Sequence, residues 1–347
     1  MRITIPFLVA HPVFGCRPRS DPSPEAFGKA FRNRLRFRKH LILFQHRVQL
    51  PIAAAAVKSD KTLLVYLGAQ KSASTWLWSY FREHPQCSSP PLKELHFFDG
   101  NPDHRSDRLG RYLDRVETQM ESADEPADSE FLQSKRRFIS HYRTVLIGNA
   151  SEEDSFPELV SWSADKDTRV VGEFTPANGM VASVSQLRNL AGLDPPPKFL
   201  MILRDPVDRI WSQIRMQASF GLSDRREIEK EAYFLLERFL EGKNNVTPVR
   251  YDYSLMLRKA RKSIPSERLL IDYFENFISE ERISNLCRFL GVDYFPPKLD
   301  EPRLRSASVP LSEFDRKRLR DTLLRQYQAV EKLLGSLPQR WRQTLAL

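Results

Sequence analysis

The sequence predicts an α/β domain of three layers, in which a central parallel sheet is flanked by helices. Four short apolar runs recur along the chain, and each has the length of a buried strand. Segments with helical periodicity separate these runs, and alternation of strands and helices is typical of parallel βαβ units. The four runs are residues 62–67, 169–174, 199–203 and 268–273, and a shorter fifth run covers 95–98.

Amphipathic stretches between the strands predict the helices. They cover residues 75–83, 131–146, 181–190, 207–218, 228–240, 255–263 and 283–290, and a long helix at 312–334 closes the chain. The acidic segment 114–129 shows little apolar periodicity and is expected to include a surface loop. At 347 residues with 41% hydrophobic content, the chain is long enough to bury a large core.

The positive charge of the chain is concentrated near its N-terminus. The net charge is +10, yet residues 1–60 hold eleven basic and three acidic residues, whereas residues 61–347 hold 43 basic and 41 acidic ones. We therefore interpret residues 1–60 as a basic, partly disordered extension, with one helix at 26–45, and residues 61–347 as the functional domain. Because the domain itself is nearly neutral, we expect no nucleic-acid partner.

Cysteine content and hydropathy indicate a cytoplasmic protein. The three cysteines, Cys16, Cys87 and Cys287, are far apart and match neither a disulfide framework nor zinc spacing. No window approaches the roughly 20 uncharged apolar residues that a membrane-spanning helix needs. The short apolar run at residues 3–10 lacks the cleavage site of a signal peptide.

The segment after the first predicted strand has the pattern of an anion-binding loop. The strand ends at Gly68, polar or small residues centred on Lys71 and Ser72 follow, and a helical pattern begins near Thr75. A helix N-terminus there would present unpaired N–H groups and the positive end of the helix dipole, and Lys71 would add a point charge. The ATP pattern G-x-x-x-x-G-K-[ST] is not met, since no second glycine precedes Lys71. Alone, the loop is equally consistent with a purely structural turn.

A second polar element follows the third apolar run. The run ends at Leu203, Arg204 and Asp205 come next, and Pro206 stands where a helix would begin. Because ligands of open parallel sheets bind at the carboxyl ends of strands, we expect Lys71 and Arg204 at the same edge. A guanidinium there suits a bidentate phosphate contact, and an Arg–Asp pair that only orders the loop is the alternative.

Carboxylates at two further places complete the candidate site. In KELHFFD (residues 93–99), Glu94 and His96 alternate with apolar residues and would share one side of a strand. A partly buried glutamate is suited to general-base work. Glu173 ends another apolar run, in GEFTP (residues 172–176). Each pattern alone is weak.

Taken together and in this order, the four elements resemble the motifs of the sulfotransferases that use 3′-phosphoadenosine 5′-phosphosulfate (PAPS). The resemblance is closest to the heparan sulfate O-sulfotransferases and their bacterial relatives. GAQKSASTWL is similar to the family's 5′-phosphosulfate loop, and LRDPVDRIWSQ to its 3′-phosphate motif. KELHFFD resembles the segment with the catalytic glutamate, and GEFTP the strand that follows it. The likeness covers about residues 61–335.

The resemblance implies a P-loop-NTPase-like fold and transfer of a sulfuryl group from PAPS to a hydroxyl or amine of a glycan or small molecule. Glu94 would take the acceptor proton, and His96 would be a second base or an orienting group. Lys71 would stabilise charge on the leaving oxygen. The implied donor-binding residues are Lys71, Ser72, Ala73, Ser74, Thr75 and Trp76 at the 5′ end, and Arg204 and Ser212 at the 3′-phosphate.

The sequence departs from the family pattern at position 174. The heparan sulfate enzymes usually carry a lysine there that helps to neutralise the transferring group, whereas this chain has Phe174. Lys71 would then be the main cation, or another residue compensates, or the acceptor is not a glycosaminoglycan. Two cysteines that bracket the cofactor loop in those enzymes also lack a counterpart. In their region Arg305 would close over the nucleotide, or belongs to an ordinary polar loop.

Two other classes of function stay open. A nucleotide kinase or NTPase would need a second loop glycine and a Mg²⁺-binding carboxylate at a strand end, and neither is evident. A non-catalytic relative would have kept the nucleotide-binding fold, with the basic N-terminal arm binding an anionic polymer. We expect no metal, because none of the seven histidines lies in a recognisable metal motif. The oligomeric state is not predicted.

Overall fold

The computed structural model describes residues 61–99, 105–121, 129–148, 151–243, 252–299 and 309–347. The predicted N-terminal extension with its helix at 26–45 lies outside the described residues, and so does Arg305.

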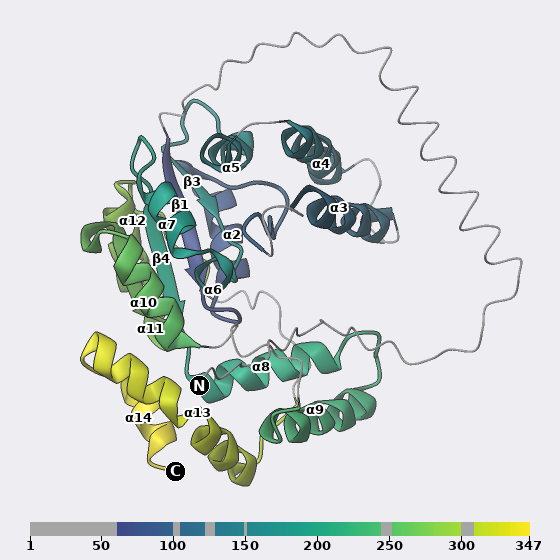
Figure 1. Ribbon diagram of the computed structural model, residues 1–347, viewed down its shortest axis with the longest axis vertical. Coiled ribbons are helices and arrows are strands. Elements are labelled where there is room, and N and C mark those ends of the chain that lie inside the picture. The colour runs from purple at the N-terminus through teal and green to yellow at the C-terminus, as the bar shows by residue number, and fades with distance from the viewer. Residues whose placement is uncertain (1–60, 100–104, 122–128, 149–150, 244–251, 300–308) are drawn as a thin grey trace, which may run out of the picture. The chain divides into compact units, whose positions relative to one another are not determined.

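Five parallel strands form the central sheet, in the order β2-β3-β1-β4-β5 (Figure 1). Every neighbouring pair is parallel, as the sequence predicts. The central strand β1 is almost wholly buried, which fits its unbroken apolar sequence. The strands are β1 (Thr62–Gly68), β2 (Cys87–Ser88), β3 (Val170–Glu173), β4 (Lys198–Leu203) and β5 (Leu269–Tyr273).

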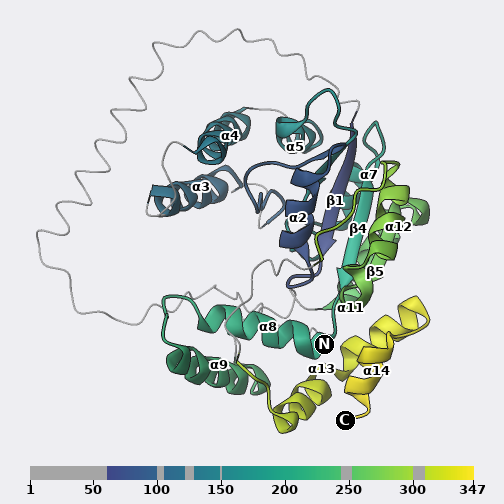
Figure 2. The ribbon, with the colours of Figure 1, turned by 180° about the vertical axis from the view of Figure 1, so that it is seen from behind.

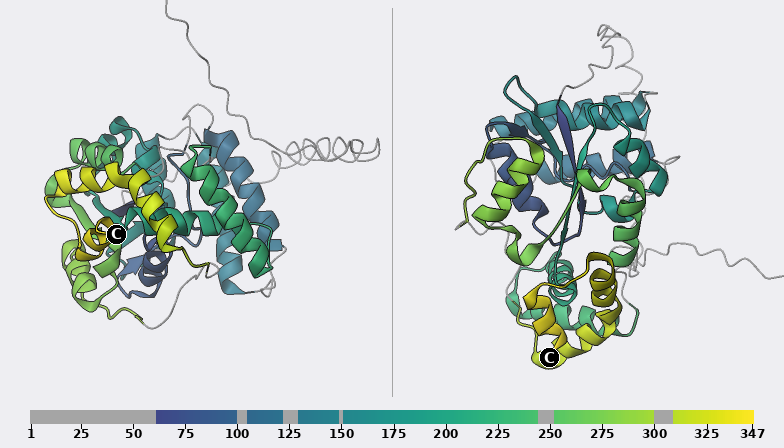
Figure 3. Two further views of the ribbon diagram at one scale, coloured as in Figure 1. Left: turned by 90° about the horizontal axis from the view of Figure 1, so that it is seen from below. Right: turned by 90° about the vertical axis from the view of Figure 1, so that its left-hand side faces the viewer.

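Helices cover both faces of the sheet (Figures 2 and 3). They are α2 (Ser74–Glu83), α3 (Arg105–Glu121), α4 (Glu130–Ile147), α5 (Glu152–Val160), α6 (Asn178–Val181), α7 (Val184–Ala191), α8 (Pro206–Ala218), α9 (Arg225–Leu240), α10 (Tyr253–Ser263), α11 (Phe274–Phe277), α12 (Glu280–Leu290), α13 (Glu313–Leu334) and α14 (Gln339–Leu345). The three-layer α/β architecture predicted from the sequence is therefore confirmed.

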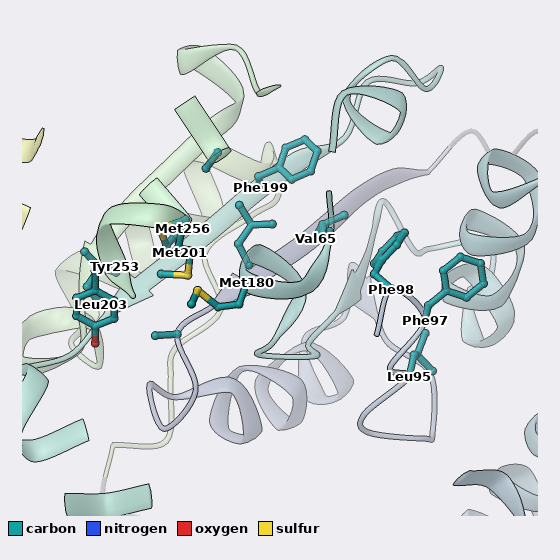
Figure 4. Packing of buried hydrophobic residues seen from close by; sticks show 14 of the residues in the cluster. Val65, Leu95, Phe97, Phe98, Met180, Phe199, Met201, Leu203, Tyr253 and Met256 are labelled. Atoms are coloured by element: carbon teal, nitrogen blue, oxygen red, sulfur yellow. The ribbon is translucent and has the colours of Figure 1, made fainter. Parts of the chain in front are cut away.

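Side chains of β1 and β4 alternate between two hydrophobic clusters. Leu64 and Tyr66 point to the face covered by α2 and α12. On the opposite face, Val65 of β1 belongs to one hydrophobic cluster with Met201 of β4 and Met256 of α10 (Figure 4). This alternation follows from the two-residue period of a strand and leaves only the strand ends free for polar chemistry.

Figure 1 shows α8, α9, α13 and α14 in the lower part of the view, beside the carboxyl ends of the strands, and Figures 2 and 3 agree. The helix α8 follows β4 directly, with Pro206 in its first turn. The side chain of Asp205 caps α8 by accepting hydrogen bonds from Val207 N (2.9 Å) and Asp208 N (3.2 Å). These contacts fix where the chain leaves the sheet after β4.

One prediction of local structure is wrong, and the surface loop expected within 114–129 stays a prediction. Residues 95–98 form an irregular turn rather than a strand, because Phe97 and Phe98 bury their rings against Phe156 of α5, at 5.3 and 4.8 Å, without any ladder. The edge strand is β2 instead. Residues 114–121 of the acidic segment are helical and belong to α3, since Val116 and Met120 extend its buried stripe. Residues 122–128 lie outside the described residues.

Among the described helices, none combines the length and apolar character that crossing a bilayer requires. Cys87 and Cys287 are buried free thiols. A cytoplasmic location stays a prediction.

Candidate functional site

The loop between β1 and α2 is held in a tight conformation. Gly68 has a φ of 114°, and a Cβ there would lie 2.5 Å from the carbonyl oxygen of Pro176, so only glycine fits. Lys71 and Ala73 also occupy the left-handed region, at φ values of 65° and 67°. The buried hydroxyl of Tyr66, in β1, donates to two carbonyl oxygens of this loop, those of Ala69 (3.2 Å) and Ser72. The backbone of the loop is thus set by the fold.

Among the described residues, no side chain caps the N-terminus of α2. The first helical hydrogen bond runs from Leu77 N to the carbonyl of Ala73 (2.9 Å), so the N–H groups of Ser74, Thr75 and Trp76 precede it. The ring of Trp76 is buried and stacks within α2, which leaves only its N–H for a ligand. These N–H groups and the positive end of the helix dipole lie where the sequence predicts an anion-binding element.

Arg204, at the end of β4, reaches the same loop. Its Nη1 donates to the carbonyl oxygen of Lys71 (2.9 Å), and its guanidinium lies 4.5 Å from the ring centroid of Phe274. The carboxylate of Asp205 caps α8 and accepts from Tyr327 (2.9 Å), while the guanidinium of Arg204 extends toward the loop. The Arg–Asp pair that only orders the loop is therefore not the arrangement that forms.

Lys71 lies in a concentration of positive charge. Burial lowers the pKa of Lys71, and the nearby charges of Arg204, Arg215 and Lys93 lower it further, whereas Glu94 raises it. Burial also lowers the pKa of Arg204. Glu94, Asp208 and Glu275 partly offset these positive charges, and a bound polyanion would reduce the remaining repulsion between the cations.

One face of α8 is turned to this loop. The sulfur of Met216 lies 3.4 Å from Lys71 Nζ, and Ser212 and Arg215 share that face at helical spacing. Ser212 is only 5% exposed. The structure therefore brings Ser212 to the side of α8 that faces the loop. Sequence reasoning missed Arg215, although its position one turn after Ser212 was the available signal.

Glu94 and His96 are neighbours in the turn that replaces the expected strand. Glu94 Oε2 lies 3.4 Å from His96 Nε2, and Oε1 lies 3.3 Å from Nζ of Lys93. His96 Nδ1 is 3.0 Å from Asp99 Oδ2. Burial lowers the pKa of His96, but the hydrogen bond to Asp99 and the charges of both carboxylates outweigh it, so the net pKa is raised. Lys93 and Asp99 are further site residues that the sequence reasoning missed.

A buried hydrogen-bond network holds this turn against β3. The Oγ1 of Thr175 accepts from Leu95 N (3.0 Å) and His96 N (3.2 Å), and it donates to the carboxylate of Glu173. Asn178 also donates to Glu173. Burial raises the pKa of Glu173 to about 7. Glu173 is therefore buried and, through Thr175, helps to hold the turn that carries Glu94 and His96.

The helix α3 supports the turn from the other side. The hydroxyl of Tyr112 donates to the carbonyl of Glu94 (2.6 Å), and its ring packs edge-on against His96 at 4.9 Å. Nη1 of Arg108 donates to the carbonyl of His96 (3.3 Å). Both backbone carbonyls around the candidate base are therefore fixed by one helix.

Phe174 takes no part in the site. Its side chain is 2% exposed and lies 4.8 Å from Phe81 and 6.2 Å from Tyr66, ring centroid to ring centroid, on the α2 face of the sheet. The cations near Lys71 instead come from Lys93, Arg204 and α8.

A pocket of about 540 Å³ lies elsewhere, beside the C-terminal end of α2. Arg82, Ser89, Phe131 and Thr168 are among the residues that line it. No residue of the candidate site lines this pocket, so we place the chemistry at the strand ends and not in the pocket. In the part of the chain that the structure describes, no group of three or more His, Cys, Asp or Glu side chains is arranged to hold a metal ion.

Comparison with known proteins gives one family. The profile of the sulfotransferase family matches residues 64–297. Among solved structures, a sulfotransferase from Alicyclobacillus acidocaldarius is similar at 20% identity and a TM-score of 0.52, covering 81% of this chain and 99% of that one. The sulfotransferase domain of a Synechococcus PCC 7002 olefin synthase is similar at 16% identity and a TM-score of 0.41, covering 83% and 94%. Curated protein sequences gave no significant match.

Proposed function

Since the chain belongs to the sulfotransferase family, we propose that it transfers a sulfuryl group from PAPS to a hydroxyl or amine of a glycan or small molecule. The observation that carries the proposal is the pairing of two anion-binding elements at the carboxyl edge of the sheet. The first element is the N-terminus of α2 together with Lys71. The second is Arg204, whose guanidinium donates a hydrogen bond to the carbonyl oxygen of Lys71. PAPS carries negative charge at the 5′ and the 3′ position of one ribose, which matches two such elements.

The residues present fit this donor. The 5′-phosphosulfate would be held by Lys71 and the N–H groups at the start of α2, and the 3′-phosphate by Arg204 and Ser212. Oγ of Ser72 is buried and has no hydrogen-bond partner among the described residues. A buried hydroxyl without a partner is costly, and an anion in the loop would satisfy it. Arg215 adds charge beside both elements.

In this proposal, PAPS supplies the sulfuryl group and a phosphate leaving group. Lys71 stabilises the charge that develops on the leaving oxygen, because it is already in place within a loop whose backbone is fixed. Glu94 takes the proton of the acceptor hydroxyl as the hydroxyl attacks. His96 and Lys93 each contact one carboxylate oxygen of Glu94 and set its direction. His96 is itself held by Asp99.

The proposal assigns the chemistry to residues 61–347 and gives the basic residues 1–60 no part in it. We also propose that the protein is cytoplasmic and that its acceptor is not a nucleic acid.

Binding of nucleotides separates this function from its alternatives. Calorimetry should show that adenosine 3′,5′-bisphosphate binds without metal and more tightly than ATP with Mg²⁺. Binding of ATP with Mg²⁺ alone would instead favour a kinase or NTPase. A transfer assay with radiolabelled PAPS against glycans, lipids and small alcohols then identifies the acceptor, and a complete lack of transfer across such a panel would favour a non-catalytic relative.

A further inference from the structure

The helix α13 is attached to the loop that carries Arg204. The hydroxyl of Tyr327, which is fully buried, donates a 2.9 Å hydrogen bond to Oδ1 of Asp205. The two residues are 122 positions apart in the chain. A contact over this separation ties the C-terminal part of the fold to the end of β4.

Asp205 connects α13 to the end of β4 and to the start of α8. Its Oδ1 also accepts from Val207 N (2.9 Å) and Asp208 N (3.2 Å), at the start of α8, and its backbone N–H donates to Glu275 Oε1 (2.8 Å). Because Arg204 immediately precedes Asp205, these bonds determine the direction in which the arginine leaves the sheet.

A second contact from α13 reaches Arg204 indirectly, through Tyr253 of α10. Gln326 Oε1 accepts from Tyr253 N (2.8 Å), and the hydroxyl of Tyr253 donates to the carbonyl of Arg204 (2.7 Å). Trp341 of α14 packs against the rings of Tyr253 and Tyr327, with centroids 6.3 and 5.8 Å apart. Gln326 and Tyr327, consecutive in α13, therefore bond Tyr253 and Asp205, and these two residues hold the chain at Arg204.

We propose that Tyr327 is a positioning residue for the 3′-phosphate of the donor, which acts by fixing Asp205 and, through it, the guanidinium of Arg204. The inference rests on the proposed function, because it takes Arg204 as the ligand of that phosphate. Removal of the Tyr327 hydroxyl leaves the buried carboxylate of Asp205 with one donor fewer. The segment that carries Arg204 then becomes more mobile, and the guanidinium of Arg204 is less often oriented toward the 3′-phosphate of the donor.

Calorimetry with two probes, adenosine 3′,5′-bisphosphate and AMP, tests the proposal. The wild-type protein should prefer the bisphosphate, and Tyr327→Phe should reduce that preference about tenfold, which corresponds to about 1.4 kcal/mol. AMP has no 3′-phosphate, so its affinity should fall much less than that of the bisphosphate. The matched control is Tyr273→Phe, because the Tyr273 hydroxyl donates to Ser336 O (3.1 Å) and its ring also packs on Trp341, at 5.3 Å.

The outcomes are distinguishable. A wild-type protein without preference for the bisphosphate would overturn the proposed function, and this inference with it. A wild-type preference that Tyr327→Phe keeps in full would overturn the inference alone. If Tyr327→Phe does not fold, Gln326→Met interrupts the second contact to Arg204 and should lower the preference in the same direction, and an unchanged preference there would count against the inference.

Discussion

Nη1 of Arg204 donates a 2.9 Å hydrogen bond to the carbonyl oxygen of Lys71. The two residues follow neighbouring strands, β1 and β4, so the bond joins the two loops at the carboxyl edge of the sheet. An arginine that is directed at one loop in this way still has further N–H groups for a ligand. The bond therefore couples the order of the Lys71 loop to the proposed 3′-phosphate site.

Arg204→Lys tests this coupling. Lysine keeps the charge but loses the planar fork, so it cannot hold the Lys71 carbonyl and a phosphate together. We expect affinity for adenosine 3′,5′-bisphosphate to fall about tenfold or more, as for loss of a charge-assisted hydrogen bond. Hydrogen exchange in residues 69–74 should become faster. Arg188→Lys on the exposed surface of α7 is the control, and equal affinities for the two variants would contradict the assignment.

Glu94→Gln tests the proposed base. The amide retains the size of the side chain but cannot accept the acceptor proton, so transfer should fall by about 10²-fold or more. Affinity for adenosine 3′,5′-bisphosphate should change little, because Glu94 belongs to the acceptor side. Glu158→Gln is a matched control, since Glu158 forms a comparable pair with His141 (3.2 Å) away from the site. Normal transfer by Glu94→Gln would remove it from the mechanism.

The sequence predicts most of this site because its residues follow strand ends. Buried parallel strands are visible as apolar runs, and the residue after each run must lie at the ligand-binding edge. Lys71 and Arg204 were placed in this way, and the structure brings them together.

The remaining residues could not be found in this way. The strand β2 has two residues and no recognisable pattern, so its place at the edge was missed. Glu94 and His96 are neighbours although their segment is no strand, because Thr175 and α3 hold the turn. Arg215 lies one turn after Ser212, so helical spacing puts both on one face of α8, but only the packing of α8 brings that face to the loop.

Thr175→Val tests whether the buried network holds the base in place. Valine has nearly the same shape but leaves the N–H groups of Leu95 and His96 without their acceptor. We expect kcat to fall about tenfold and stability to fall by about 1–3 kcal/mol, with nucleotide affinity unchanged. Thr168→Val is the control, because its buried hydroxyl bonds Asp165 in another loop. It should lower stability but not kcat, and equal kcat values for both variants would refute the role of Thr175.

Glu173 should make the protein less stable as pH rises. Its pKa is about 7 in the folded protein and about 4.3 when unfolded. Between these values the folded state holds a proton that the unfolded state has released, so the free energy of unfolding falls with increasing pH. Urea unfolding across this range should show a shallower fall in the free energy of unfolding for Glu173→Gln, by roughly 4 kcal/mol in total. Part of the slope should persist, because burial also raises the pKa of Asp205, to about 6. Identical slopes for wild type and variant would contradict the burial of an ionisable Glu173.

Arg215→Gln tests whether the charge on α8 serves the donor. The charge of Arg215 lowers the pKa of Lys71. Removal of this charge should therefore raise the pKa of Lys71. A structural role alone would then leave nucleotide affinity equal or improved. If Arg215 faces the donor, affinity for adenosine 3′,5′-bisphosphate should instead fall about five- to tenfold and depend less on salt, since one fewer cation attracts the polyanion. Arg261→Gln, on the exposed face of α10, controls for net charge. Calorimetry at two salt concentrations decides between the two roles, and an affinity that rises in Arg215→Gln would exclude it from the donor site.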